Sequence, residues 1–154
     1  MSNKHEEEPR IKSLHSNQPA YLTFINRTGN PVDIAWLDYR GNIVRYRHKL
    51  GSGGICHQDT YFTHPWIAWH SYTLERATFC GKKFYLPEPY KGGRHRTVVY
   101  IDRPVKSLLQ LCLQAVKNLV RAEDVDQLEI PKDLQDPLKN RRRIDFVDEI
   151  VYRR

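Results

Sequence analysis

Short stretches of alternating hydrophobic and polar residues follow one another between Pro19 and Ile101, and stretches rich in glycine, asparagine and aspartate separate them. Alternation with a period of two is typical of half-buried β-strands, and several such strands at a spacing of roughly 8–12 residues indicate an antiparallel sandwich or barrel. We therefore predict an all-β sandwich of about seven antiparallel strands, at residues 21–25, 32–37, 43–46, 66–69, 77–80, 84–86 and 97–101.

The period changes after Pro104, where Leu108, Cys112 and Val116 follow one another at intervals of four residues. Further leucines widen this row into a broad apolar stripe, which predicts an amphipathic helix capped by Asp102 or Ser107. A second short helix is expected over about 123–130, and a third between Pro131 and Pro137. The sequence thus predicts a small all-α domain of three helices after the β-sandwich.

Four segments follow from these patterns. Residues 1–18 are polar and lack periodicity, so they are expected to form a flexible tail. The β-sandwich is assigned to residues 19–102, the α domain to 103–138, and a C-terminal helix that could pack back on the β domain to 139–154. An α domain of this size buries little core, so the excess apolar surface of its first helix must be covered by the β domain or by a partner.

Charge and composition narrow the class of protein. Lys and Arg total 25 against 18 Asp and Glu, and the surplus lies almost wholly in the first 101 residues, which hold 14 basic and 8 acidic side chains. No apolar run approaches the roughly 18 residues of a membrane span, and none has the character of a secretory leader. The three cysteines form no close pair, which favours a reducing compartment, so we expect a protein of the cytoplasm and nucleus without membrane contact.

The sequence motifs give little support for metal binding or for catalysis. The residues Cys56, His57, His64, His70 and Cys80 lack the paired spacing of structural zinc ligands, so we expect no metal and no cofactor. The glycines at 51–54 lack the lysine of a phosphate-binding loop, and no catalytic residues are recognised. The basic and aromatic stretch 45–49 could line a groove for single-stranded nucleic acid, although exposed strands also carry such residues for solubility.

A denser group of functional side chains lies between Thr60 and Trp66, where a hydroxyl, an imidazole and an indole occur within seven residues. Trp36 and Tyr46 in earlier strands add aromatic surface. Aromatic walls around two hydrogen-bonding groups suit a small, rigid, partly polar ligand. The alternative is that these aromatic residues only fill the core of the sandwich.

Two further motifs resemble known protein-binding boxes. Residues 107–116, with Ser107, Leu108, Cys112 and Val116 at the key positions, resemble the box that binds elongin C. Residues 130–134, an aliphatic residue and a proline followed after two positions by another aliphatic residue, resemble the box that selects cullin-2. In this order behind a β domain, and together with residues 26–28, 36–39, 46 and 60–66, they make roughly residues 10–138 resemble the von Hippel–Lindau tumour-suppressor family.

The resemblance implies a substrate receptor of a cullin–RING ubiquitin ligase with no catalytic residues of its own. Its substrates would be the α subunits of hypoxia-inducible factor after prolyl hydroxylation. Its partners would be elongin C with elongin B, and cullin-2 with its RING subunit; nucleic acid would not be a partner. The implied elongin C contacts are Ser107, Leu108, Leu111, Cys112 and Val116, and the implied cullin contacts are Ile130, Pro131 and Leu134.

The resemblance also assigns roles in the hydroxyproline site. Thr60 and His64 would bond the 4-hydroxyl group, Trp66 would form the floor, and Trp36 and Tyr46 the walls, while Asp59 would flank the peptide. If both hydrogen-bonding groups stayed unpaired with plain proline, discrimination would reach roughly 10²–10³-fold. Two other functions stay open: a basic β domain that binds single-stranded nucleic acid and carries a helical interaction tail, and an elongin-binding adaptor that recognises another degron.

Overall fold

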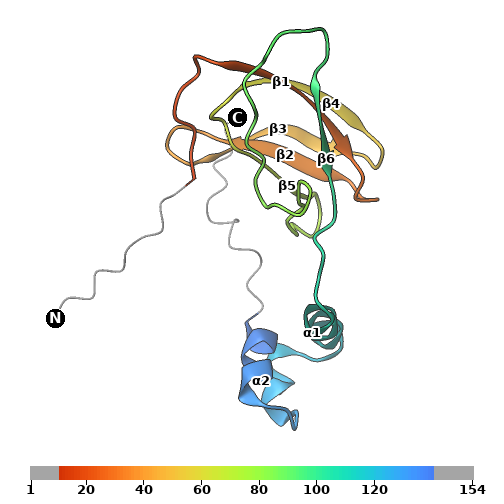
Figure 1. Ribbon diagram of the computed structural model, residues 1–154. Helices are drawn as coiled ribbons and strands as arrows, with labels where there is room; N and C mark the ends of the chain where they lie inside the picture. Colours follow the sequence, from red (N-terminus) through yellow and green to blue (C-terminus); the bar gives the residue numbers. More distant parts are fainter. Residues whose placement is uncertain (1–10, 141–154) are drawn as a thin grey trace, which may run out of the picture. The chain divides into compact units, whose positions relative to one another are not determined.

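The computed structural model describes residues 11–140, which divide into a β unit up to Pro104 and a helical unit from Val105 onward. The six strands of the β unit are β1 (Pro19–Asn26), β2 (Val32–Leu37), β3 (Ile43–Leu50), β4 (Ile55–Tyr61), β5 (Trp66–His70) and β6 (Thr97–Ile101). The three helices are α1 (Leu108–Leu119), the 3₁₀ helix η1 (Ala122–Gln127) and α2 (Lys132–Lys139) (Figure 1).

The strands form two three-stranded sheets, one in the order β4-β1-β6 and the other in the order β3-β2-β5. Figure 1 shows β1 and β4 in one layer of the β unit and β2 and β3 in the other. All pairs are antiparallel except β1 with β6, which run parallel in the register Leu22 to Thr97 through Asn26 to Ile101. The prediction of purely antiparallel strands was therefore wrong for this pair.

The two sheets face each other across one hydrophobic core. Leu22 and Phe24 of β1, Ile34 of β2 and Trp66 of β5 all belong to the same buried cluster. The Phe24 ring lies 5.4 Å from Trp66 and 6.1 Å from Phe79, measured between ring centroids. Phe24 is therefore an aromatic residue that joins the two layers.

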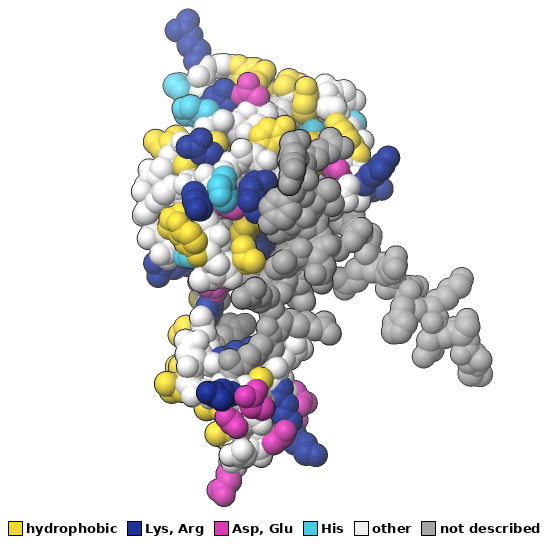
Figure 2. All heavy atoms as spheres, turned by 180° about the vertical axis from the view of Figure 1, so that it is seen from behind, with side chains coloured by type: hydrophobic (Ala, Val, Ile, Leu, Met, Phe, Trp, Pro, Cys, Tyr) yellow, Lys and Arg dark blue, Asp and Glu magenta, His cyan; other side chains and the backbone are white. Residues whose placement is uncertain are grey.

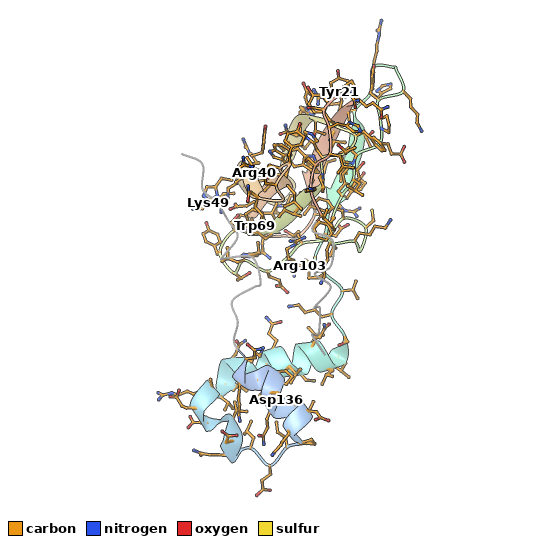
Figure 3. The ribbon with its side chains drawn as sticks, turned by 90° about the vertical axis from the view of Figure 1, so that its left-hand side faces the viewer. Tyr21, Arg40, Lys49, Trp69, Arg103 and Asp136 are labelled. Carbon is orange, nitrogen blue, oxygen red and sulfur yellow. The ribbon has the colours of Figure 1, made fainter. Side chains whose placement is uncertain are left out.

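The sheet β3-β2-β5 is apolar on its other face as well. A second buried cluster contains Ala35, Leu37, Ile43, Ile67 and Trp69, with Leu74 and Phe84 packed against it. Trp69 is labelled in Figure 3, at a distance from Tyr21 of the other sheet. β2 therefore reads as an almost continuous hydrophobic segment, which is typical of a strand covered on both faces.

The predicted strand count of seven was too high, and two predicted strands were misplaced. Residues 77–80 and 84–86 make only isolated bridges, such as the pairs of Phe79 with Lys82 and of Trp66 with Tyr85. A strand that was not predicted, β4, pairs along its whole length with β1. Its outward positions carry His57 and Asp59, which hid the β pattern in a polar stretch.

The helical unit contains the three helices expected of it, and α1 starts at the predicted cap, Ser107. The third helix does not end at Pro137 as predicted but continues to Lys139. An internal proline costs about 3 kcal/mol, and the burial of the next residue, Leu138, offsets much of it with about 1.5–3 kcal/mol. The C-terminal helix predicted for 139–154 lies almost wholly outside the described residues.

Candidate functional site

His64 lies in the turn that joins β4 to β5, and backbone hydrogen bonds fix this turn. The His64 N–H donates to the Tyr61 carbonyl at 3.1 Å, and the Leu37 N–H donates to the Pro65 carbonyl at 2.9 Å. The second bond ties the turn to the end of β2. The His64 side chain is only 6% exposed, so both its position and its orientation are constrained.

Five residues that sequence analysis assigned to one site lie together, and we call them the ring cluster: Trp36, Tyr46, Thr60, His64 and Trp66. The His64 ring stacks on Trp36, with centroids 4.5 Å apart and planes inclined by 14°. Trp36 meets Tyr46 edge to face at 6.4 Å, and Tyr46 meets Trp66 edge to face at 5.5 Å. Trp66 Nε1 donates to Thr60 Oγ1 at 3.1 Å, which links the ring cluster back to β4.

The hydrogen-bonding capacity of Thr60 is only half used. The side chain is buried and its oxygen accepts from Trp66 Nε1. Within residues 11–140, no acceptor lies in hydrogen-bond range of the Thr60 hydroxyl hydrogen. A buried donor without a partner costs about 1–3 kcal/mol, so this hydroxyl is suited to a ligand atom that accepts.

His64 supplies the complementary acceptor. Burial lowers the pKa of His64 from its ordinary value, because a charged imidazole is poorly solvated there. A hydrogen bond to the His15 backbone opposes this shift, and the charge of the His15 side chain adds to it. The ring is thus held neutral, with one nitrogen that donates and one that accepts.

Tyr46 owes its place to an irregularity in β3. The pairing of β2 with β3 shifts register twice along the pairs Val32–Leu50, Ile34–Arg47 and Ala35–Arg45. Each shift adds one residue to β3, and the second extra residue is Tyr46. A bulged residue is free of the regular alternation, so the Tyr46 ring lies against Trp66 while over half of the side chain stays exposed.

Asp33 of β2 anchors the bulged part of β3. Its carboxylate is 1% exposed and accepts hydrogen bonds from Ser71 Oγ at 2.6 Å and from the Lys49 backbone N–H at 2.9 Å. His48 Nδ1 lies 3.0 Å from both carboxylate oxygens, and Arg45 Nε lies 3.3 Å from one of them. Sequence analysis gave Asp33 no role, and its only signal is an acidic residue inside an apolar strand.

Two further residues adjoin the ring cluster and were not predicted. The Tyr39 hydroxyl lies 3.3 Å from His64 Nε2 and 2.7 Å from Ser16 Oγ. The Tyr39 ring meets Trp36 edge to face at 5.9 Å. Tyr39 belongs to the stretch 36–39 that carries the family resemblance, but its hydroxyl group was not recognised as functional.

Residues 13–15, which sequence analysis placed in the tail, bind to the same region. The Ser13 N–H donates to the Asp38 carbonyl at 3.1 Å. Thr63 Oγ1 accepts from the His15 N–H at 3.0 Å and donates to the His15 carbonyl at 2.8 Å. This segment therefore forms one border of the ring cluster.

Asp59 is not brought into the ring cluster. It precedes Thr60 in β4, and successive side chains of a strand point to opposite faces. The Asp59 carboxylate is exposed and lies 2.6 Å from Arg96 NH2. Its role beside the peptide stays a prediction.

In the helical unit, α1 presents an uncovered apolar face. Ser107 Oγ accepts from the Gln110 N–H, while the Gln110 side chain accepts from the Ser107 N–H, so that Ser107 completes a capping box. No residue of α1 is buried, and Leu108 is 78% exposed. Leu111 and Cys112 are also exposed, and Val116 is half-buried.

The three residues of the cullin-type motif lie at the start of α2. Pro131 is the N-cap, and the Leu134 N–H donates to its carbonyl at 3.0 Å. Gln135 Nε2 donates to the Ile130 carbonyl at 3.1 Å, so the segment before the helix is fixed to its second turn. Ile130 and Leu134 are half-buried and Pro131 is exposed.

Two kinds of feature are absent from residues 11–140. No group of three or more histidine, cysteine, aspartate or glutamate side chains lies close enough there to hold a metal ion. None of the helices in that range has the length and apolar character needed to cross a membrane.

Comparison with protein families agrees with the division into two units. Residues 11–93 match the family model of the VHL beta domain, and residues 107–145 match the model of the VHL box domain. The first match contains the whole ring cluster, and the second contains α1, η1 and α2. With more than half of its residues in the first match alone, the chain belongs to the VHL family.

Proposed function

We propose that this chain is the substrate-recognition subunit of a cullin–RING ubiquitin ligase, working in the cytoplasm and nucleus. Its β unit would bind prolyl-hydroxylated α subunits of hypoxia-inducible factor, and its helical unit would bind elongin C and cullin-2. The ligase would thereby direct ubiquitination and degradation of the substrate in response to oxygen. Family membership and the chemistry of the ring cluster support this proposal.

The single observation that carries the proposal is that Thr60 and His64, both in the ring cluster, offer complementary hydrogen-bonding groups. Thr60 has a buried hydroxyl hydrogen with no acceptor in the described part of the chain, and His64 has a neutral ring with one acceptor nitrogen. A ligand hydroxyl group can accept a hydrogen bond from Thr60 and donate one to His64, so it would satisfy both side chains at once. The 4-hydroxyl of hydroxyproline is such a group, and its ring is apolar and rigid enough to pack against Trp66 and Trp36.

Plain proline leaves the Thr60 donor unpaired. The cost of about 1–3 kcal/mol for one buried unpaired group corresponds to a preference for hydroxyproline of roughly 5- to 150-fold. The hydroxylated peptide is thus preferred chiefly because the unmodified peptide supplies no acceptor for the Thr60 hydroxyl group.

The uncovered face of α1 supports the second half of the proposal. Leu108, Leu111 and Cys112 are exposed on a helix that buries no residue of its own. An apolar helix face of this kind suits a hydrophobic groove in a partner, which is the role we assign to elongin C. The start of α2, with Ile130, Pro131 and Leu134, is then the contact for cullin-2.

Calorimetry tests the proposal. The full chain, co-expressed with elongin B and elongin C, is titrated with a peptide that contains 4-hydroxyproline and with its proline twin. We expect a preference for the hydroxylated peptide of at least about fivefold. Thr60→Val should remove most of the preference, because valine has a similar shape but no hydroxyl group, and Thr60→Ser should retain it.

Equal affinity for the two peptides, or no binding of either, would contradict the proposal. Binding of single-stranded oligonucleotides that weakens steeply with salt would instead favour a nucleic-acid-binding β domain. Selective binding of an unrelated peptide in the presence of elongins would favour an adaptor for another degron.

A further inference from the structure

The hydroxyl group of Tyr39 occupies the acceptor that the proposed function assigns to the ligand. It lies 3.3 Å from His64 Nε2 and 2.7 Å from Ser16 Oγ. The Tyr39 ring is edge-on to both His64, at 5.5 Å, and Trp36, at 5.9 Å. His64 therefore has a hydrogen-bond partner within the chain before any ligand arrives.

The direction of these hydrogen bonds depends on the tautomer of His64. We assign the hydrogen of the neutral His64 ring to Nδ1, which leaves Nε2, the nitrogen 3.3 Å from the Tyr39 hydroxyl group, as the acceptor. Tyr39 donates its one hydroxyl hydrogen to Nε2, and Ser16 donates in turn to the Tyr39 oxygen.

We propose that Tyr39 is a specificity-determining residue that takes the place of the ligand hydroxyl at His64 Nε2, both in the free protein and when unmodified proline is bound. The inference rests on the proposed function and deepens it. On this inference, the ratio of affinities for the hydroxyproline and proline peptides depends on the side chains around His64 as well as on the ligand.

Tyr39 is suited to exchange with a ligand. A separation of 3.3 Å is at the long end for a hydrogen bond, and the Tyr39 side chain is 45% exposed, so its hydroxyl group can turn to water and keep Ser16 as a partner. The His64 ring itself stays fixed by its stack on Trp36. A ligand hydroxyl thus replaces Tyr39 at Nε2 without moving the imidazole.

The consequence is that the affinity for the proline peptide is reduced less than it would be without Tyr39. When proline binds, Tyr39 stays on Nε2 and no acceptor is left unpaired, so His64 adds little to discrimination and Thr60 carries most of it. Removing the Tyr39 hydroxyl group should leave Nε2 unpaired in the proline complex alone. The variant should then discriminate more sharply than the natural protein.

The test compares Tyr39→Phe with the natural sequence in the full chain bound to elongin B and elongin C. Affinity for the proline peptide, measured by NMR titration, should fall by roughly five- to thirtyfold, because one buried acceptor loses its partner. Affinity for the hydroxyproline peptide should stay within about threefold, since the ligand hydroxyl fills the same position. Tyr72→Phe, an exposed tyrosine away from the ring cluster, serves as the matched control and should leave both affinities unchanged.

A second measurement needs no variant. In the natural protein, the Nε2 nitrogen-15 signal of His64 should keep its position when the proline peptide binds and shift when the hydroxyproline peptide binds. An unchanged peptide preference in Tyr39→Phe, or equal shifts with both peptides, would overturn the role of Tyr39 while leaving hydroxyproline recognition intact. Absence of any preference in the natural protein would overturn the proposed function, and this inference with it.

Discussion

Asp33, Thr60 and His64 are among the polar side chains of the β unit that are at least nine-tenths buried, and they differ in how their hydrogen bonds are satisfied. The Asp33 carboxylate has four neighbours that donate to it or oppose its charge. Thr60 has a donor without an acceptor in the described chain, and His64 Nε2 has only a long bond to an exposed tyrosine. Full satisfaction indicates a structural role, while the two partly satisfied groups have capacity left for a ligand.

This distinction predicts how substitutions of two aspartates will differ. Asp33→Asn removes the charge that faces Arg45 and His48 inside the sheet, so we expect the free energy of unfolding to fall by about 3 kcal/mol. Asp59→Asn breaks only an exposed ion pair with Arg96 and should cost under about 1 kcal/mol. Urea unfolding of the full chain, followed by tryptophan fluorescence, measures both. Similar midpoints for the two variants would show that Asp33 does not anchor the bulge of β3.

The lowered pKa of His64 predicts a dependence of peptide binding on pH. A ligand hydroxyl can donate to Nε2 only while the ring is neutral, and the folded protein keeps it neutral below the ordinary histidine value of 6.5. Affinity for the hydroxyproline peptide should therefore stay constant from about pH 8 to 6.5 and fall only at lower pH, as His64 gains its proton. Fluorescence polarisation between pH 5 and 8 follows this profile.

The same shift affects stability with a definite sign. The unfolded chain takes up a proton on His64 at a higher pH than the folded chain, so the His64 contribution is fully present above about pH 6.5 and is lost as the pH falls through the lower folded value. His57→Gln is the control, because His57 is exposed on the outward face of β4 and its side chain bonds only to Thr23 among the described residues. A flat profile in the natural protein, or loss of the profile in His57→Gln, would contradict the assignment to His64.

At the scale of elements, the sequence correctly predicts a helix or strand where its local signals agree. α1 was recognised with its cap because the apolar period and the serine at its start agree. No strand is predicted at β4 because its outward residues are polar, whereas residues 77–80 and 84–86 resemble strands because they share buried residues such as Phe79 with the core. The bulge that places Tyr46 depends on Asp33, 13 positions away, and no local pattern contains that contact.

The ring cluster was likewise predictable only in part. Its members were found by residue type and by the family resemblance, but their contacts depend on the pairing of β2 with β5 and on the turn at His64. Tyr39 and Ser16 escaped prediction because their role is a hydrogen-bond chain between segments 23 residues apart. Such chains are set by tertiary geometry, which a sequence pattern does not encode.

For α1, the exposed face predicts that a substitution can abolish partner binding without affecting the folding of the chain. Cys112 is exposed, so Cys112→Phe adds bulk without disturbing the packing of the free chain, yet it should abolish co-purification with elongin C by a clash in the partner's groove. Gln114→Phe makes the same change about 200° further round the helix and should leave co-purification intact. Pull-down from co-expressing cells, with circular dichroism of both variants, gives the comparison. Elongin retained by Cys112→Phe would remove α1 from the interface.

On the scale of the whole molecule, the two units differ in charge as well as in fold. The basic surplus belongs to the first 101 residues, whereas the remainder is nearly balanced with 11 basic and 10 acidic side chains. Figure 2 shows acidic and basic side chains close together on the visible face of the helical unit. Within this unit, Lys139 pairs with Asp126. Figure 3 labels Asp136 on α2 in the same unit. The basic β unit is thus suited to an acidic peptide, and the helical unit to partners bound through apolar contacts.

The two units should also differ in how far they depend on partners. In the described helical unit only Val125 and Leu138 are buried hydrophobic residues, and a helix of 12 residues is marginal in water without packing. We therefore expect amides of α1 to exchange with solvent within seconds to minutes in the isolated chain, while those of β5, whose first four residues are buried, resist for hours. Addition of elongin B and elongin C should slow exchange in α1 by at least about tenfold and leave β5 unchanged, because a partner that binds only the folded helix stabilises it by mass action.

Hydrogen-exchange mass spectrometry of the full chain resolves the two elements in one experiment, with Cys112→Phe as the control that should gain no protection. If α1 in the isolated chain were as protected as β5, or if elongins left its exchange unaltered, the helical unit would be a self-sufficient domain and its exposed leucines would need another explanation.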